Sequence, residues 1–350
     1  MFSERMKRLL SYTPGEQPQD RKYLKLNTNE NPYPPSPLIK SVLDRFDIER
    51  LRLYPDPQCG RLREKLSLRY GLSKNQVFVA NGSDEALSFC FYAFFGSEKG
   101  KLLFPQITYS FFPVYCSFYN IAYDAVPLND DFTIDVGKYV EKIGCGVILP
   151  NPNAPTGIGL PLEKLAYLLD NYPKERVVVI DEAYVDFGAE SAVGLIHKYP
   201  NLAVVRTFSK SMGLAGLRLG FVLASETLVS ALFTVKDSFN SYPVDTLSQM
   251  IGETALSDEA YYRAITKEII SVRKDFSAAL LDLGWSVLPS SSNFIFTRKS
   301  GLSGEEIYSN LKKQGILVRY FDLEPIKQFV RITIGKKEDM QRVLKTIKEF

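Results

Sequence analysis

A lysine among hydroxyl groups and glycines gives the clearest chemical signal in the sequence. Lys210 lies in Thr207-Phe-Ser-Lys-Ser-Met-Gly-Leu-Ala-Gly-Leu-Arg-Leu-Gly, with Thr207 and Ser209 before it and Arg218 after it. Hydroxyl groups and a guanidinium suit a phosphate dianion, since arginine can bind two oxygens at once. A lysine beside that phosphate could form a Schiff base with an aldehyde on the same ligand. A surface lysine in a glycine-rich loop is the alternative.

A carboxylate follows a run of apolar residues in Val-Val-Val-Ile-Asp-Glu-Ala-Tyr, where the acid is Asp181 and the last residue is Tyr184. In parallel sheets the carboxyl ends of the strands face the ligand crevice. A carboxylate there could keep a pyridine nitrogen protonated, so that the ring accepts electrons, and Tyr184 could donate to the ring's phenolate oxygen. ATPases also carry Asp-Glu pairs at strand ends, but the sequence lacks their G-x-x-x-x-G-K-[ST] loop.

Two loops add weaker signals. Gly82, Ser83 and Asp84 precede an apolar helical pattern, and the start of a helix can hold phosphate through its N–H groups. Simple helix capping by Ser83 or Asp84 is the alternative. A Pro-Asn-Ala-Pro-Thr-Gly loop at 152–157 follows the apolar run 146–150, where it is either a turn or a cover over the ring.

The composition is that of an ordinary globular protein, with 350 residues, 45% hydrophobic and 24% charged. Its net charge of +3 gives no reason to expect a nucleic-acid or membrane partner. Residues 102–123 carry no charge, but their prolines and polar residues favour a buried strand–loop–helix over a membrane span. The N-terminus lacks the apolar run of a signal peptide, so we expect a cytoplasmic protein.

Histidine and cysteine usage narrows the chemistry further. His197 is the only histidine, which excludes a His dyad or a multi-His metal site, and we expect no metal. The four cysteines show no C-x-x-C spacing, so we expect reduced thiols.

The candidate functional residues must be positioned by helices and strands, and the pattern of apolar residues predicts strands that alternate with helices. Apolar runs at 77–80, 101–104, 146–150, 177–183 and 203–210 predict strands, with helical spacing between them. Such alternation is typical of a mostly parallel sheet in an α/β fold. A long helical stretch over 245–283 follows, and then a compact α+β region.

We therefore expect two domains. Residues 38–245 would form the large domain, and residues 1–37 with 246–350 a small α+β domain that includes an extended N-terminal arm, since 14–37 is rich in Pro, Asn and Gln.

Taken in order, these motifs resemble those of fold-type-I aminotransferases that use pyridoxal phosphate (PLP), and most closely the histidinol-phosphate aminotransferase family. The resemblance covers nearly the whole chain. It is carried by Leu-Asn-Thr-Asn-Glu-Asn-Pro (26–32), Tyr-Pro-Asp-Pro (54–57), Asn-Gly-Ser-Asp-Glu-Ala (81–86), Pro-Asn-x-Pro-Thr-Gly (152–157), Val-Ile-Asp-Glu-Ala-Tyr (179–184), Ser-Lys-x-x-x-Leu-Ala-Gly-Leu-Arg (209–218) and Val-Arg-Ile-Thr-Ile-Gly (330–335).

The resemblance implies how PLP would be bound. Lys210 would form the Schiff base and move the proton, Asp181 would pair with the ring nitrogen, and Tyr184 would contact the phenolate oxygen. Tyr109 would stack on the ring, although a core tyrosine is the alternative. The phosphate would be bound by Gly82, Ser83, Asp84, Thr207, Ser209 and Arg218, and by Tyr54 from a neighbouring subunit, which implies a homodimer with shared sites.

The resemblance also implies a substrate site. Arg331 would bind the anionic end of the substrate and Arg319 would join it, with Tyr12 and Asn29 on the same side. One departure stands out: the family usually has Asn before Pro-Thr-Gly, where this chain has Ala154. Either Asn153 shifts to replace that asparagine as a cofactor ligand, or Tyr184 acts alone.

The implied reaction transfers an amino group between histidinol phosphate and 2-oxoglutarate, giving imidazole-acetol phosphate and glutamate, a step of histidine biosynthesis. An aromatic amino acid aminotransferase or a threonine-phosphate decarboxylase on the same fold is the nearest alternative. A non-catalytic PLP-binding module is an alternative of a different class.

Overall fold

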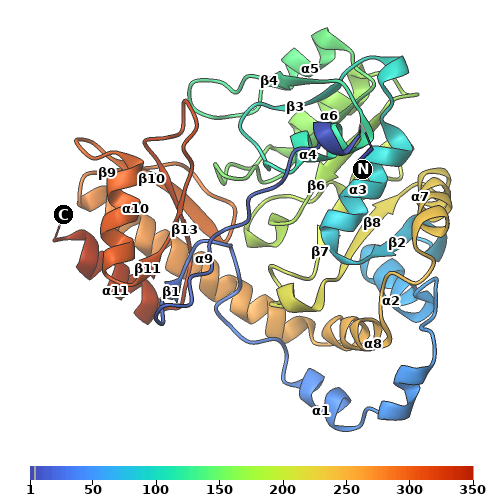
Figure 1. Cartoon of the computed structure of the whole chain (residues 1–350), viewed down its shortest axis with the longest axis horizontal. Coiled ribbons are helices and arrows are strands. Elements are labelled where there is room, and N and C mark those ends of the chain that lie inside the picture. Colours follow the sequence, from blue (N-terminus) through green and yellow to red (C-terminus); the bar gives the residue numbers. More distant parts are fainter. Residues whose placement is uncertain (4, 350) are drawn as a thin grey trace.

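A sheet of seven strands forms the centre of the computed structural model, which describes residues 1–3 and 5–349 (Figure 1). In space the strands follow the order β2-β8-β7-β6-β5-β3-β4, and only the pairs that β8 makes are antiparallel. The expected mostly parallel α/β fold is confirmed. The strands are β2 (Val77–Ala80), β3 (Leu102–Pro105), β4 (Tyr123–Val126), β5 (Gly146–Pro150), β6 (Val177–Asp181), β7 (Leu202–Thr207) and β8 (Gly220–Ala224).

Helices cover both faces of this sheet, which is why its strands read as continuous apolar runs. Every residue of β5, β7 and β8 is buried. Helices that contribute to the core on one face include α2 (Gly60–Tyr70), α5 (Gly137–Lys142), α6 (Leu162–Asn171) and α8 (Thr246–Ala255). Those on the other face are α3 (Gly82–Phe94), α4 (Phe112–Tyr119) and α7 (Glu226–Phe239).

The C-terminal third forms a second, antiparallel sheet in the order β12-β13-β10-β9, coloured orange and red in Figure 1. It has a hydrophobic core of its own, to which Leu26 of the N-terminal arm contributes. The elements are α9 (Glu259–Asp282), β9 (Trp285–Val287), β10 (Phe294–Lys299), α10 (Gly304–Lys313), β11 (Ile316–Leu317), β12 (Arg319–Tyr320), β13 (Val330–Thr333) and α11 (Lys337–Ile347).

The N-terminal arm is extended, as the sequence predicts, and runs between the two sheets (Figure 1). Near its start, Leu10 N donates to Ser117 Oγ on α4 at 3.3 Å. Further on, Glu16 pairs with Lys312 Nζ on α10 at 2.5 Å. The arm then adds β1 (Leu24–Lys25) in parallel to β11 and leads into α1 (Leu38–Asp44). The arm therefore contacts α4 of the large-sheet half before Tyr12 and α10 of the second-sheet half after Tyr12.

Two expectations about helices have clear outcomes. The prediction of a single helical stretch over 245–283 is wrong, because α8 ends at Ala255 and α9 begins at Glu259. The Asp258 carboxylate caps the start of α9 by accepting from the Tyr261 N–H. Residues 102–123 form β3 and α4 and then lead into β4, so the strand–loop–helix prediction is confirmed. Among the described residues, no helix is both long and apolar enough to cross a bilayer.

Candidate active site

A cavity of about 200 Å³ opens at the carboxyl edge of the large sheet, where β6 and β7 end, and extends to the second sheet. It brings together most of the residues that the sequence singled out. Those that line it are Tyr12, Asn29, Ser83, Asp84, Tyr109, Asp181, Tyr184, Ser209, Lys210, Arg218, Arg319 and Arg331.

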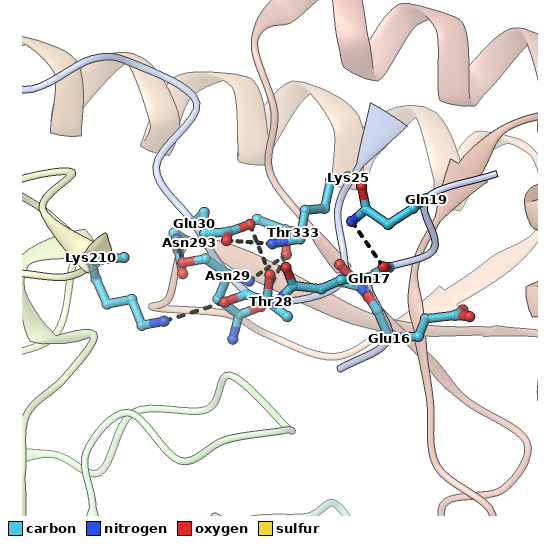
Figure 2. A network of polar contacts seen from close by, with 12 residues as sticks. Glu16, Gln17, Gln19, Lys25, Thr28, Asn29, Glu30, Lys210, Asn293 and Thr333 are labelled. Carbon is cyan, nitrogen blue, oxygen red and sulfur yellow. Dashed lines mark hydrogen bonds and ion pairs between the residues drawn. The ribbon is translucent and has the colours of Figure 1, made fainter. Parts of the chain in front are cut away.

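Lys210 enters the cavity from the turn after β7. Its Nζ donates to the Thr28 carbonyl at 3.3 Å (Figure 2) and lies 5.6 Å from the centre of the Tyr184 ring. Asn31 Nδ2 donates to the Lys210 carbonyl at 2.9 Å, so the arm also fixes the backbone of this turn. The surface-lysine alternative therefore does not describe Lys210, whose side chain reaches into the cavity.

Asp181 ends β6 inside the cavity with only 6% of its surface exposed. Burial raises the pKa of its carboxyl to about 7, and the nearby charges of Asp84 and Glu182 add to this. A bond at 3.0 Å from the Ala183 N–H and the charge of Lys210 oppose the shift. A cationic partner in the cavity would favour the ionised form of this carboxyl.

The Tyr184 hydroxyl is oriented by a relay from the second sheet. Asn29 Nδ2 donates to Tyr184 Oη at 2.9 Å, and Thr333 Oγ1 donates to Asn29 Oδ1 at 3.1 Å (Figure 2 shows Asn29 beside Thr333). The Asn29 N–H in turn donates to Thr333 Oγ1 at 3.0 Å, which fixes the direction of the relay. Because Tyr184 Oη accepts from Asn29, its own hydrogen is available to a ligand in the cavity.

Arg218 and the first turn of α3 form one end of the cavity. Arg218 Nη2 pairs with Asp84 Oδ2 at 2.9 Å, and Tyr109 Oη donates to Asp84 Oδ1 at 2.9 Å. Gly82 has a φ of 83°, which favours glycine, and a Cβ at this position would lie 2.6 Å from Arg218 Nη2, so any side chain here would displace the guanidinium. Ser209 Oγ accepts from Thr207 Oγ1 at 2.9 Å beside them.

The alternative interpretation, in which Ser83 or Asp84 caps α3, is wrong. The helix already begins at Gly82, and Glu85, not Asp84, accepts the Asn81 N–H at 2.7 Å. Ser83 and Asp84 therefore lie in the first turn and line the cavity, where the helix presents N–H groups to an anion.

Arg331 and Arg319 form the opposite end. Arg331 donates from Nη2 to the Asn27 carbonyl at 3.1 Å, and its guanidinium lies 5.5 Å from the Phe321 ring centre. Burial lowers the pKa of Arg331 below its usual value, although a guanidinium stays charged near neutral pH. Arg319 donates to the Thr13 and Pro14 carbonyls of the arm at 3.2 Å each. Two cations thus face one side of the cavity.

Aromatic rings close the space between these two ends. The Tyr12 ring centre lies 4.8 Å from that of Phe111 and 6.4 Å from that of Tyr109. Tyr109 is therefore both a cavity residue and part of an aromatic cluster, since its ring also packs edge-on against Phe112 at 5.8 Å.

Four residues of the sequence-based set do not line this cavity: Gly82, Thr207, Asn153 and Tyr54. Gly82 lies next to Arg218, and Thr207 is hydrogen-bonded to Ser209, so both contact residues that line the cavity. Asn153 points elsewhere, since its Nδ2 donates to the Ile107 carbonyl at 2.9 Å, while Ala154 lines the cavity in its place. The Asn153 side chain therefore does not take the place of the family's asparagine in this structure, which favours the other alternative, that Tyr184 acts alone. Tyr54 is 83% exposed on another face.

Sequence reasoning missed Asn27, Thr28, Thr108 and Phe321, which also line the cavity. Asn27 and Thr28 belong to the same Leu-Asn-Thr-Asn-Glu-Asn-Pro motif as Asn29, so that motif was the available signal. Three buried polar atoms of cavity residues have no hydrogen-bond partner in the described part of the chain: Asn27 Oδ1, Thr108 Oγ1 and Arg331 Nε. Buried polar atoms are rarely left unpaired, which indicates that a polar ligand completes this cavity.

Comparisons with known proteins agree with this geometry. The family model described as aminotransferase class I and II matches residues 21–347. The histidinol-phosphate aminotransferase of Syntrophus aciditrophicus is 58% identical over 100% of this chain and 98% of its own, and that of Brachyspira hyodysenteriae is 46% identical over 99% and 98%.

A solved structure has the same fold. The histidinol-phosphate aminotransferase of Sinorhizobium meliloti, in complex with pyridoxal-5'-phosphate, has a TM-score of 0.87 at 22% identity, covering 99% of this chain and 98% of its own. The full-length match to the curated relatives, together with the family model, shows that this chain belongs to the aminotransferase class I and II family, among its histidinol-phosphate aminotransferases.

Proposed function

We propose that this PLP-dependent transaminase transfers the amino group of histidinol phosphate to 2-oxoglutarate, giving imidazole-acetol phosphate and glutamate in histidine biosynthesis. The observation that carries the proposal is the pair Arg319 and Arg331 at one end of the cavity. Two guanidinium groups can bind a phosphate monoester in one half of the reaction and the side-chain carboxylate of glutamate in the other. The 58% identity to a relative named for this activity supports the same substrate.

The residues present fit PLP. The first turn of α3, Ser209 and Arg218 offer N–H, hydroxyl and guanidinium donors for its phosphate, and Gly82 keeps that space open. We assign Ser83, Asp84 and Thr207 to the same phosphate site, where Asp84 holds Arg218 in place at 2.9 Å. Tyr109 lies where its ring can stack on a ligand ring, and we assign it that role.

PLP, when bound, supplies a ring that accepts the electrons left when the substrate loses its Cα proton. We propose that Asp181 keeps the proton at the ring nitrogen, because a carboxylate in a buried site gains most from a cationic neighbour. Tyr184, oriented by Asn29, would donate its hydroxyl hydrogen to the ring oxygen. Lys210 Nζ would hold the aldehyde of the cofactor and would also serve as the base that takes the proton from the substrate Cα.

On the substrate side, we propose that Arg331 binds the anionic end and Arg319 adds a second cation. Tyr12 and Asn29 line the same part of the cavity. Arg319 donates one N–H from each terminal nitrogen to the Thr13 and Pro14 carbonyls, which leaves N–H groups for the substrate, so the arm holds a residue that would contact the substrate.

We also propose a homodimer in which Tyr54 reaches the phosphate of the neighbouring site. Tyr54 stacks on Tyr242 with ring centres 4.7 Å apart, and apolar side chains such as Ile48, Leu51 and Leu53 are exposed on the same segment. Such a surface is typical of a protein–protein contact. The buried Lys236 supports this segment by donating to the Pro57 carbonyl at 3.1 Å and the Ser241 carbonyl at 3.0 Å.

The division into residues 38–245 and residues 1–37 with 246–350 is likewise a proposal. The separate core of the second sheet supports it, but α8 and the start of α9 pack into the core of the large sheet. We therefore propose that the physical boundary lies within α9. A cytoplasmic location is also proposed, and it is supported by four free, buried cysteines.

One experiment tests the substrate. The protein is loaded with PLP, and histidinol phosphate, phenylalanine and threonine phosphate are added one at a time. Conversion of the cofactor to its amine form by histidinol phosphate, faster than by phenylalanine, is the expected result. Faster conversion by phenylalanine would favour the aromatic amino acid aminotransferase. Release of carbon dioxide from threonine phosphate would favour the decarboxylase, and no response to any amine would favour the non-catalytic binding module.

A further inference from the structure

A cluster of charged side chains lies behind the active site and has no part in the proposed reaction. Arg206 Nη1 lies 3.5 Å from Glu182 Oε2, and Arg206 Nη2 forms an ion pair with Asp186. The side chains of Arg206 and Glu182 are 7% and 0% exposed, whereas that of Asp186 is 41% exposed. The guanidinium also lies 5.2 Å from the centre of the Tyr70 ring.

This cluster and the active-site cavity are on opposite faces of the large sheet. Asp181 pairs with Val205 across β6 and β7, and the Glu182 N–H donates to the Val205 carbonyl at 2.8 Å. Side chains alternate along a strand, so Glu182 and Arg206 point away from the face of Asp181. Asp186 and Arg206 accordingly line a different, open cavity. The cluster therefore does not touch a ligand bound at Asp181.

The cluster is nevertheless joined directly to the residue after Lys210. Ser211 Oγ donates to Asp186 Oδ2 at 2.5 Å, and Ser211 is only 6% exposed. From the other side, Asn31 Nδ2 donates to the carbonyls of Lys210 and Ser211 at 2.9 and 3.2 Å. The turn that carries Lys210 is thus fixed by the arm on one side and by Asp186 on the other.

We propose that Ser211, Asp186 and Arg206 are positioning residues that fix the turn of Lys210 relative to Asp181. The flexible side chain of a lysine adds no restraint of its own, so the region that Nζ can reach depends on where the backbone is anchored. Asp186 is half-exposed and would move without Arg206, which Glu182 and Tyr70 fix in turn. Glu182 is anchored by bonds from Ser191 Oγ at 2.7 Å and Ala192 N at 2.5 Å. The inference rests on the proposed role of Lys210.

The test compares the variants Ser211→Ala and Asp186→Ala, the double variant, and Asp186→Asn. We expect each alanine variant to lower kcat about tenfold while KM stays within about twofold, because a misplaced catalytic group costs turnover more than binding. The double variant should be no slower than the slower single variant, since both remove one link. Asp186→Asn should stay near wild type, because its Oδ1 can still accept from Arg206 while its Nδ2 donates to Ser211 Oγ.

A second readout separates positioning from general loosening of the fold. The absorbance of the cofactor bound to Lys210 is titrated with pH, and its midpoint should move in Ser211→Ala and Asp186→Ala but not in Asp186→Asn. The matched control is Ser67→Ala, a buried serine that donates only to the Glu64 carbonyl of its own helix at 2.8 Å. It should leave both kcat and the midpoint unchanged.

The outcomes distinguish this inference from the function on which it rests. If wild type binds PLP at Lys210 and turns over while Ser211→Ala behaves like Ser67→Ala, the positioning role is wrong. Independent, additive losses in the two alanine variants would also contradict it. If wild type itself fails to bind PLP at Lys210, the proposed function fails first.

Discussion

Asp181 and Lys210 line the same cavity because their strands are neighbours: Asp181 pairs with Val205 of β7, and Lys210 follows that strand in the next turn. The carboxylate therefore enters from the end of β6 and the amine from the turn beyond β7. A flat heterocycle between them can meet the acid at one edge and the amine at another. This placement lets one ring be protonated and bonded to the chain at the same time.

Replacing Asp181 by Asn should stabilise the cofactor-free protein at high pH only. The folded-state pKa of Asp181 is raised from 3.8 to about 7, so the protonated carboxyl is the favoured folded form. Its contribution to stability is complete below the unfolded pKa and is lost as pH rises through about 7. Asp181→Asn should therefore have a higher free energy of unfolding than wild type at pH 8, by at most about 4 kcal/mol, and so unfold at a higher temperature there but not at pH 4. Equal unfolding temperatures at pH 8 would contradict a buried, ionised carboxylate.

Arg331 should be needed for anionic substrates. Losing a charged hydrogen bond costs about 1.5–3 kcal/mol, so Arg331→Gln should raise KM for histidinol phosphate roughly 10- to 100-fold. Arg319→Gln should act in the same direction. The matched control is Arg298→Gln, an exposed arginine on the same sheet that does not line the cavity. Steady-state kinetics in which all three variants have the same KM would exclude an anion site here.

Ala154 should weaken the support of the ring oxygen. Ala154 is 6% exposed and lines the cavity where the family usually has asparagine. Ala154→Asn would add a donor beside Tyr184, and a donor favours the deprotonated oxygen and so lowers the pKa of the bound cofactor. The pH midpoint of its absorbance should move down. Asn153→Ala, away from the cavity, is the control, and an unchanged midpoint in Ala154→Asn would show that the donor does not reach the ring.

Hybrid dimers should reveal whether Tyr54 acts across subunits. In the proposed homodimer, Lys210→Ala and Tyr54→Ala should each reduce activity, but a hybrid of the two variants contains one site with both residues intact if Tyr54 serves the neighbouring site. Random mixing should then restore about a quarter of the wild-type activity. Because a Tyr54 that acts within its own subunit would leave every hybrid site defective, no gain on mixing would contradict the proposed sharing.

The residues at strand ends could be predicted from the sequence because short-range patterns define them. Asp181 follows a buried run and Lys210 follows another, and parallel strands bring their carboxyl ends to one edge. Arg218 and Gly82 could be assigned through the resemblance of their motifs. These residues could be assigned to the site without knowing how distant segments of the chain pack.

Other features depend on tertiary packing and were missed. Thr28 meets Lys210 only because the arm crosses between the two sheets. β8 was not predicted, because it begins at Gly220, at the end of a glycine-rich segment that does not resemble a strand. Gly220 is needed there because a Cβ at this position would lie 2.4 Å from Ser83 N, a contact that only the three-dimensional structure reveals. The break between α8 and α9 depends on the Asp258 cap, which a helical spacing pattern does not reveal.

The central claim is that Lys210 binds the cofactor, and borohydride reduction tests it most directly. Purified protein is mixed with PLP, reduced and digested, and the modified peptide is identified by mass spectrometry. We predict a phosphopyridoxyl group on Lys210, and none there if histidinol phosphate is added before reduction. Modification of another lysine instead, or no modification at all, would contradict the account.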